Sequence, residues 1–375
     1  MTLAIGIDYT PAYEQGGGIG RYVRELIGAL AQQDQSTSYR LFVMGAGRKA
    51  LPPPPGPNFS FAPASLTPVW FARLWHRAHL PIPVENWVGK VNLYHATDFV
   101  LPPTRRSTRT VLTVHDLSFV RVPEAASPSL KAYLDAVVPR SVRQADQVLA
   151  DSAATKNDLC ELYGVDPGKI EVLYSGVHPR FRPTPEGASI RAKYGLGDAP
   201  YVLAVGTVQP RKNYQRLIEA LSQLPPDLDD VQLVIAGGKG WLQGPIYESV
   251  DRLGVRDRVR FIGFVEDADL PALYSEARAL AFPSLYEGFG LPILEAFACG
   301  TPVLTTPVSS LIEVAGDATI LVDPLSVEAI RDGLARLLRD ETLRAQLIER
   351  GFIQAAQFTW ERAAMQLRAV YQRWL

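Results

Sequence analysis

Cysteine is almost absent from this chain of 375 residues, which contains only Cys160 and Cys299. Two cysteines so far apart in the sequence give no disulfide framework, so a reducing compartment, the cytoplasm, is expected. The chain also lacks an apolar run of about 18 residues that could cross a membrane. Its first residues enter a strand-like run at Leu3 without the basic and apolar regions of a signal peptide, so none is expected.

An excess of charge of one sign is lacking as well, because the formal net charge is −1. A balance this close to neutral gives no basic footprint for nucleic acid, and no nucleic-acid partner is expected. Hydrophobic residues make up 47% of the chain and charged residues 21%, which is enough apolar material for full cores. A chain of this length is expected to form two domains or one large one.

The best-known glycine loops for nucleotides are missing. The loop at residues 16–20 reads G-x-G-x-G, which is not the spacing of the dinucleotide fingerprint. Residues 164–169 end in Gly-Lys, but their glycines are one residue too close, and Ile170 stands where a P-loop needs Ser or Thr. The first loop stays open to two interpretations, a backbone cradle for a phosphate or an acceptor, and a flexible surface loop.

Apolar runs of strand length alternate with amphipathic helical segments along the whole chain. Strands are expected near residues 3–8, 38–44, 92–95, 110–114, 148–151 and 169–174, and again near 201–205, 231–236, 258–262, 279–282, 303–305 and 319–321. This alternation is typical of doubly wound parallel α/β sheets. The proline-rich segment 179–185 is the expected linker between an N-terminal domain, 1–178, and a C-terminal domain, 186–357.

The most informative stretch runs from Pro283 to Pro302. It predicts the end of a strand, a glycine loop and a short helix that has Pro292 in its first turn and stops at Gly300. Glu287 therefore precedes a helix N-terminus, whose N–H groups attract phosphate and hydroxyl oxygens. Glu295 lies inside the same helix, and both carboxylates could accept hydrogen bonds from sugar or ribose hydroxyls.

Glu287 and Glu295, with Gly-Phe-Gly-Leu-Pro between them and Cys-Gly-Thr-Pro-Val after them, resemble the E-x7-E motif of the retaining glycosyltransferases of family 4. The resemblance implies the GT-B fold, in which two Rossmann-like domains face each other across a cleft and the last helix, about 359–375, returns to the N-terminal domain. It also implies transfer of a sugar from a nucleotide-sugar donor to an acceptor hydroxyl, with retention at the anomeric carbon.

The resemblance extends to residues outside this stretch. Arg211, Lys212 and Asn213 match the family's Arg-Lys-Asn motif, and the two cations could clamp a diphosphate. The catalytic residues implied are then Glu287, His115, Arg211 and Lys212, and Glu295 would hold the ribose. Further roles implied are donor binding by Gly206, Phe289, Gly290 and Leu291, and contact with a phosphate or the acceptor by Gly17 and Gly18.

His115 follows a predicted strand at its carboxyl end, the edge that holds ligands in open α/β sheets. The run Thr113–Leu117 resembles the family's donor-site histidine, so His115 is predicted to reach the donor sugar or its phosphate, and a structural histidine is the alternative. Asp267-Ala268-Asp269 mimics the metal motif of another glycosyltransferase fold. We interpret it as a cap of the following helix, because acidic residues suit a helix start, and we expect neither a metal nor a cofactor.

The runs 237–241 and 18–22 resemble bacterial mannosyltransferases of lipopolysaccharide and exopolysaccharide assembly. GDP-mannose is therefore the favoured donor, UDP-glucose is the alternative, and a saccharide or lipid-linked saccharide is the expected acceptor. Residues 70–79 mix aromatic with basic side chains and favour a packed helix with one basic face. Peripheral contact of this segment with the inner face of a membrane stays open.

Three other functions stay open beside this one. A non-hydrolysing sugar-nucleotide epimerase of the GT-B type would turn over the donor without an acceptor. A glycoside phosphorylase would need a lysine that carries pyridoxal phosphate. A non-catalytic protein that binds a sugar nucleotide would show no transfer.

Overall fold

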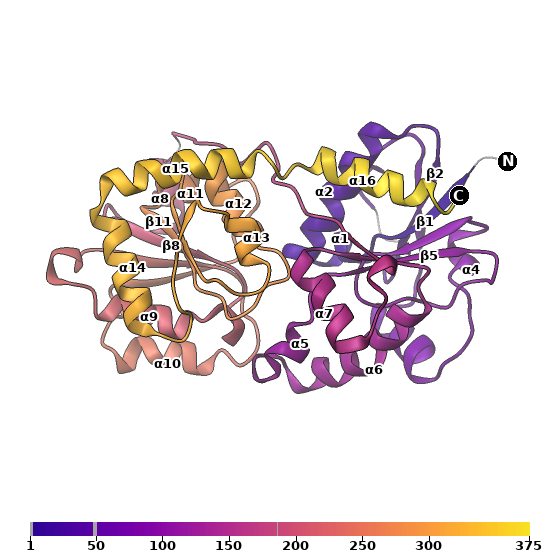
Figure 1. The fold of residues 1–375 in the computed structure, drawn as a ribbon, viewed down its shortest axis with the longest axis horizontal. Helices are drawn as coiled ribbons and strands as arrows, with labels where there is room; N and C mark the ends of the chain where they lie inside the picture. The colour runs from indigo at the N-terminus through magenta and orange to yellow at the C-terminus, as the bar shows by residue number, and fades with distance from the viewer. Residues whose placement is uncertain (1–2, 48–50, 186) are drawn as a thin grey trace. The chain divides into compact units, whose positions relative to one another are not determined.

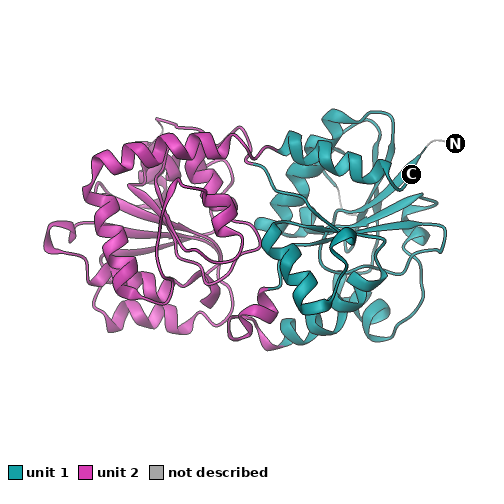
Figure 2. Ribbon diagram, viewed as in Figure 1, with its two compact units in different colours: residues 1–117, 129–176, 360–375 teal, residues 118–128, 177–359 magenta. Residues whose placement is uncertain are grey.

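A computed structural model describes residues 3–47, 51–185 and 187–375. They form two compact units, each with one parallel sheet between helices (Figures 1 and 2). Unit 1 contains residues 1–117, 129–176 and 360–375, and unit 2 contains 118–128 and 177–359. Residues 118–128, which the sequence analysis placed in the N-terminal domain, thus belong to unit 2. Residues 1–2 and 186, where the two predicted domains begin, lie outside the described residues.

The sheet of unit 1 has seven parallel strands within the described residues, in the order β3-β2-β1-β4-β5-β6-β7. The strands are β1 (Ala4–Asp8), β2 (Ser38–Val43), β3 (Phe59–Pro63), β4 (Leu93–Ala96), β5 (Arg109–Val114), β6 (Gln147–Ala150) and β7 (Ile170–Val172). The strand order reverses between β1 and β4, which makes the carboxyl ends of these two strands the expected ligand edge. The predicted doubly wound parallel sheet is confirmed.

Helices cover both faces of this sheet, with α2 and α16 on one side and α6 and α7 on the other (Figure 1). The helices of unit 1 are α1 (Thr10–Glu14), α2 (Gly18–Gln33), α3 (Pro68–Phe71), α4 (Glu85–Val88), α6 (Pro128–Gln144), α7 (Ala153–Tyr163) and α16 (Trp360–Gln372). The C-terminal helix α16 packs on α2, and the hydroxyl of Tyr371 lies 2.7 Å from Nδ1 of the buried His95 in β4. Ser152 caps α7 by accepting a hydrogen bond from the N–H of Thr155, as predicted.

Four local features of unit 1 differ from the sequence prediction. Helix α1 and strand β3 were not expected, and α2 begins at Gly18, inside the predicted glycine loop. The close approach of α1 to α2 explains one of these glycines, because a Cβ on Gly20 would lie 2.0 Å from the carbonyl oxygen of Gln15. The aromatic and basic segment forms a short α3 followed by a π-helix, Ala72–Arg77, rather than one regular helix.

The sheet of unit 2 has six parallel strands within the described residues, in the order β10-β9-β8-β11-β12-β13. The strands are β8 (Tyr201–Val205), β9 (Gln232–Ala236), β10 (Val259–Gly263), β11 (Ala279–Phe282), β12 (Val303–Thr305) and β13 (Thr319–Leu321). Their positions agree with the predicted strands to within one residue. The order reverses between β8 and β11, so the ligand edge of this sheet lies at the carboxyl ends of those strands.

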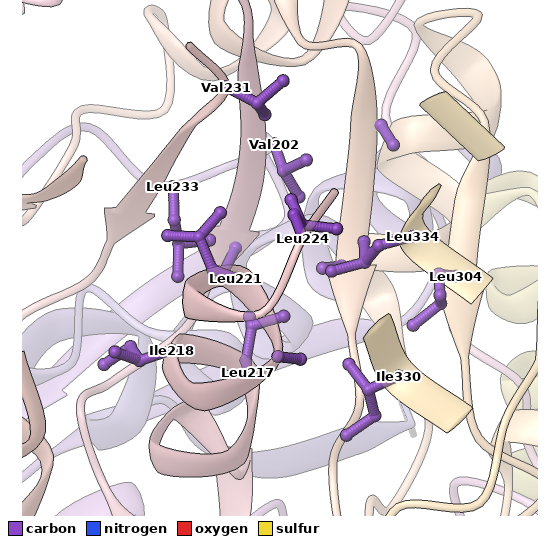
Figure 3. Close-up of a cluster of buried hydrophobic side chains, with 14 of the residues drawn as sticks. Val202, Leu217, Ile218, Leu221, Leu224, Val231, Leu233, Leu304, Ile330 and Leu334 are labelled. Atoms are coloured by element: carbon purple, nitrogen blue, oxygen red, sulfur yellow. The ribbon is translucent and has the colours of Figure 1, made fainter. Parts of the chain in front are cut away.

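Alternate residues of these strands contribute side chains to two hydrophobic cores, one on each face of the sheet. Val202 and Ala204 of β8 join the core beneath α9, α10 and α14, part of which Figure 3 shows, whereas Tyr201 and Leu203 join the core beneath α8, α11 and α12. Strands buried on both faces are typical of parallel sheets. The helices of unit 2 are α5 (Ser118–Arg121), α8 (Gly187–Tyr194), α9 (Tyr214–Ser222), α10 (Gly244–Arg252), α11 (Leu270–Glu276), α12 (Leu291–Ala298), α13 (Leu311–Ala315), α14 (Val327–Arg339) and α15 (Glu341–Ala355).

No helix in the described part of the chain has both the length and the apolar character needed to cross a membrane.

Candidate functional site

The ligand edge of unit 2 carries one carboxylate between two cations. Nη1 of Arg211 lies 2.6 Å from Oε2 of Glu287, and Nζ of Lys212 lies 2.7 Å from Oε1. Nη1 of Arg211 also donates to the carbonyl oxygen of Tyr286 at 2.6 Å. The side chains of Arg211, Lys212 and Glu287 are only 16%, 10% and 9% exposed. We call these three residues the ionic cluster; it carries one positive charge in excess.

Glu287 is ionised in this cluster. Burial alone would raise the pKa of its carboxyl, but the charges of Arg211 and Lys212, together with hydrogen bonds, outweigh burial and lower that pKa to about 2. Nζ of Lys212 also lies 4.6 Å from the ring centroid of Phe282, a cation–π contact at the end of β11. The cluster therefore presents fixed charges in a poorly hydrated place, where their electrostatic effect is strong.

Local sequence explains how the segment after β8 positions the two cations. Gly206 has φ +140°, and a Cβ there would lie 2.8 Å from Cε of Lys212, so only glycine lets the lysine stem pass. Asn213, at φ +61°, turns the chain into α9. Its side-chain Nδ2 donates to the carbonyl oxygens of Pro283 at 3.0 Å and Pro324 at 2.7 Å, which ties the loop after β8 to the segments that follow β11 and β13.

Two serines that the sequence analysis missed hold the loop around Glu287. Oγ of Ser309 accepts from the N–H of Glu287 and donates to its carbonyl oxygen, both at 2.9 Å. Oγ of Ser310 lies 2.9 Å from the same carbonyl oxygen and 2.7 Å from that of Phe289. Ser309 has φ +45°, an unusual backbone conformation for this residue type that often accompanies function. These serines follow Glu287 by more than twenty residues, and no motif marks them.

The structure places the other predicted donor residues around the start of α12. Gly290 has φ +125° and stands directly before Leu291, the first residue of the helix, and Phe289 packs edge-on against Phe358. Glu295 is 1% exposed and accepts a hydrogen bond from the hydroxyl of Tyr274 at 2.8 Å. The structure thus joins Gly206, Arg211, Lys212 and Glu287, whereas Glu295 lies within the core. Its contact with a ribose stays a prediction.

In unit 1, His115 lies just beyond β5 with a partner at each ring nitrogen. Nδ1 lies 2.8 Å from Oδ2 of Asp151, and Nε2 donates to the carbonyl oxygen of Thr97 at 2.9 Å. Burial alone would lower the pKa of His115, but the charges of Asp151 and Asp98 and these hydrogen bonds raise it to about 9. The imidazolium is therefore held by the protein itself, and its predicted contact with a donor needs a change of partners.

Carboxylates that the sequence analysis missed lie at the same edge of the sheet as this histidine. Asp8, Asp98 and Asp151 stand at the carboxyl ends of β1, β4 and β6, and Asp116 follows His115. Burial, with smaller contributions from Asp98 and Glu14, raises the pKa of Asp8 to about 6. Burial likewise raises the pKa of Asp98. We call the four aspartates and His115 the acidic cluster. Their positions after strands were the only sequence signal.

Two predicted glycines belong to the same edge of unit 1. Gly17 is the N-cap of α2 and Gly18 is its first residue, so the predicted cradle is a helix N-terminus rather than a free loop. Apart from neighbouring residues in the sequence, no heavy atom lies within 4 Å of a Cβ placed on either glycine. Packing therefore does not demand glycine at these positions, in contrast to Gly20.

The Asp267–Asp269 segment ends at the N-cap of α11, as the capping interpretation predicts, but no side-chain hydrogen bond caps the helix. Asp269 is the N-cap residue, but its Oδ2 instead accepts hydrogen bonds from Lys193 and Tyr194 of α8, both at 2.6 Å. Arg180 lies 3.8 Å from Asp267. The described residues include no group of three or more His, Cys, Asp or Glu side chains arranged to hold a metal.

Comparison with known proteins gives matches over both units. The family model "Glycosyltransferase Family 4" matches residues 16–181, and "Glycosyl transferases group 1" matches residues 188–354. The O-antigen chain mannosyltransferase B of Escherichia coli is 35% identical over 284 residues, which cover 75% of this chain and 74% of that protein.

Solved structures share the fold at low identity. WaaG, a glycosyltransferase involved in lipopolysaccharide biosynthesis, superposes with a TM-score of 0.75 at 20% identity, covering 98% of this chain and 99% of WaaG. HepE of Anabaena, solved in complex with UDP and glucose, gives a TM-score of 0.74 at 21% identity over the whole of both chains. At these identities the likeness concerns the fold, which is GT-B.

Proposed function

Because the chain belongs to family 4 of the glycosyltransferases, we propose that it moves a sugar from a nucleotide-sugar donor to a hydroxyl of a saccharide acceptor, with retention at the anomeric carbon. The ionic cluster of Arg211, Lys212 and Glu287 is the observation that carries this proposal. Two cations held at the ligand edge of a Rossmann-like sheet suit a diphosphate, and a fixed carboxylate beside them suits sugar hydroxyls.

The ionic cluster has a defined task in this reaction. The bond between the anomeric carbon and the diphosphate oxygen breaks, and the acceptor oxygen bonds to the same face of the sugar. The proton of the acceptor hydroxyl passes to the leaving diphosphate. Arg211 and Lys212 stabilise the charge that builds on the diphosphate, and Glu287 holds donor hydroxyls and offsets positive charge on the sugar.

Glu287 has a second task before the donor binds. Its carboxylate neutralises most of the charge of two buried cations, which would otherwise be costly to bury. When a diphosphate enters, its oxygens take over part of that neutralisation and leave the carboxylate available for hydroxyls. The diphosphate thus replaces Glu287 as a counter-ion of the two cations, without a metal or another cofactor.

The favoured donor is GDP-mannose, and UDP-glucose is the alternative. Support for mannose comes from the Escherichia coli relative, whose name is that of a mannosyltransferase, and support for UDP comes from HepE, which binds it. The names of that relative and of WaaG support a role in lipopolysaccharide or another cell-surface polysaccharide. The acceptor proposed is a saccharide or a lipid-linked saccharide.

The four aspartates of the acidic cluster in unit 1 suit the acceptor rather than the diphosphate. Carboxylates accept hydrogen bonds from hydroxyls and repel phosphate, and Gly17 and Gly18 offer backbone N–H groups beside them. His115 acts on the donor sugar or its phosphate in this proposal. The proposed location is the cytoplasm, with peripheral contact at the inner membrane face through the exposed Val69 and Trp70.

A donor screen tests the proposal. Thermal unfolding is measured with GDP, GDP-mannose, UDP and UDP-glucose, because a ligand that binds the native state raises the midpoint by mass action. Transfer to a saccharide acceptor is then followed with the best donor, and NMR of the product reads the anomeric configuration. Donor turnover without an acceptor, or a product of inverted configuration, would contradict the proposal.

A further inference from the structure

Unit 1 contains a cavity of about 320 Å³ that does not belong to either cluster described above. Its walls come from the π-helix, the segment after it, the loop between β4 and β5, and α6. Thr110 at the start of β5 and Asp146 just before β6 place it at the amino ends of the strands. The acidic cluster lies at the carboxyl ends, about 17 Å away along β5 at 3.3 Å per residue.

Three guanidinium groups line this cavity without a carboxylate partner. Arg105 and Arg106 are exposed and make no side-chain hydrogen bond or ion pair within the described residues, and Arg140 pairs only with a histidine. Asp146, the acidic lining residue, is engaged elsewhere. Its Oδ1 lies 3.1 Å from Arg109, and its Oδ2 accepts from the N–H and the hydroxyl of Thr110. In a chain of net charge −1, this is a local concentration of positive charge.

The histidines at the cavity lie close to this positive charge. Nδ1 of His79 accepts a hydrogen bond from Arg140 at 2.5 Å. Burial, then the charges of Arg140 and His79, lower the pKa of His76 to about 4. His79 has φ +52°, and the preceding helix has a π turn, two unusual backbone features of the kind that accumulate at functional sites.

The segment 101–106, which carries Arg105 and Arg106 and which we call the arginine loop, is held in place without a ligand. At one end the N–H of Leu101 donates to Oγ of Ser141, and at the other the N–H of Arg105 donates to Oε1 of the buried Glu85. Between them the carbonyl oxygen of Pro103 accepts from the N–H of Val84. A rigid loop loses little conformational freedom on binding, so the positions of its arginines are prepared.

From this arrangement we infer that the cavity binds a phosphate ester. Guanidinium groups match phosphate oxygens in geometry, and three of them can neutralise a dianion. The apolar walls, which include Trp75, Leu80 and Pro102, suit a ligand whose phosphate carries an apolar or saccharide part. A phosphoryl group of a soluble ester and one of a lipid headgroup share this chemistry. The site is separate from the ionic cluster and does not rest on the proposed function.

The experiment follows the imidazole NMR signal of His76 in the full chain. Inorganic phosphate, and separately vesicles of phosphatidylglycerol with phosphatidylcholine, are added across a pH series. A bound anion should raise the titration midpoint of His76, because it offsets the charge of Arg140. The variants Arg105→Gln and Arg106→Gln should each weaken the response about tenfold, since each removes a charge-assisted hydrogen bond. Arg143→Gln, on α6 but outside the cavity, is the control.

Each outcome either supports or overturns the phosphate site. A response to phosphate that the two variants weaken and the control keeps supports the site for a soluble ester. The same pattern with anionic vesicles alone supports a lipid headgroup. A His76 signal that neither probe moves, or that responds equally in the Arg105 and Arg106 variants, overturns the inference. Sugar transfer should be unchanged in all three variants, so the result stands apart from the proposed function.

Discussion

The same edge of the same kind of sheet carries opposite chemistry in the two units. Unit 2 places two cations around Glu287 at the carboxyl ends of β8 and β11, whereas unit 1 places four aspartates and His115 at the carboxyl ends of its strands. In the first cluster the cations lower the pKa of a carboxyl, and in the second the carboxylates raise the pKa of an imidazole. The fold supplies the edge, and the side chains decide which ligand it favours.

The largest effect is expected for Glu287→Gln, which removes the central charge of the ionic cluster. Transfer should fall by about a hundredfold to a thousandfold, because the donor loses preorganised stabilisation. The free energy of unfolding should also fall by about 3 kcal/mol, because Arg211 and Lys212 keep no buried counter-ion. Turnover at saturating donor and urea unfolding measure the two effects. The exposed Glu328→Gln of α14 is the control. Activity within about twofold of the parent would remove Glu287 from the site.

Arg211→Ala and Lys212→Ala should follow in size. Each removes one cation that faces the diphosphate in the proposed reaction, which should cost roughly 3 kcal/mol in the barrier, or about a hundredfold in kcat/KM. Product inhibition by the nucleoside diphosphate should weaken in parallel. Arg256→Ala, an exposed arginine in the same unit, serves for comparison. An unaltered inhibition constant in both variants would show that the cationic edge does not bind the diphosphate.

Asp98→Asn tests the other side of the comparison. If the acidic cluster serves the acceptor, the KM for the acceptor should rise about tenfold, the usual loss for one hydrogen bond to a charged group. The affinity for the nucleoside diphosphate should stay the same. Asp135→Asn, on the exposed face of α6, controls for a general change of charge. Weaker diphosphate binding with an unchanged acceptor KM would reverse the assignment of the two edges.

The pH dependence of stability should separate the two clusters. The folded-state pKa of His115, about 9, lies above its ordinary value of 6.5, so its contribution is complete below pH 6.5 and is lost as pH rises through about 9. The pKa of Glu287, about 2, lies below its ordinary value of 4.5, so its contribution is present above pH 4.5 and is lost as pH falls toward 2.

Urea midpoints across this pH range measure both losses. His115→Gln should flatten the alkaline side of the profile only, and Glu287→Gln the acid side only. An alkaline slope that persists in His115→Gln would assign it to another group.

The smallest effect is expected from EDTA, which should leave transfer unchanged. In the proposed reaction, the two cations of the ionic cluster perform the task that a metal performs on a pyrophosphate in other enzymes. Asp269, the end of the segment that mimics a metal motif, is engaged with Lys193 and Tyr194. Loss of transfer on chelation, with recovery on addition of magnesium or manganese, would show that the cationic edge is not sufficient by itself.

The strands illustrate where prediction from sequence succeeds. β11, β12 and β13 coincide with the predicted ranges, because short apolar runs between glycines and prolines are a local signal. β3 was missed, because it follows a proline-rich run and ends at Pro63, which an edge strand tolerates and a sequence pattern does not reveal. The π-helix at 72–77 also escaped prediction, since its side-chain spacing resembles that of an ordinary helix.

The sequence by itself determined the class of fold and the chemistry of one edge. Alternating strands and helices specify parallel sheets, and Arg211, Lys212 and Glu287 lie in unbroken motifs. Only the tertiary structure decided which groups meet. Lys212 contacts Glu287 across 75 positions of sequence, Ser309 holds the Glu287 loop, and Asp98 and Asp151 come from two different strands to His115. The reason is topological, since the order of parallel strands joins residues whose separation along the chain carries no periodic signal.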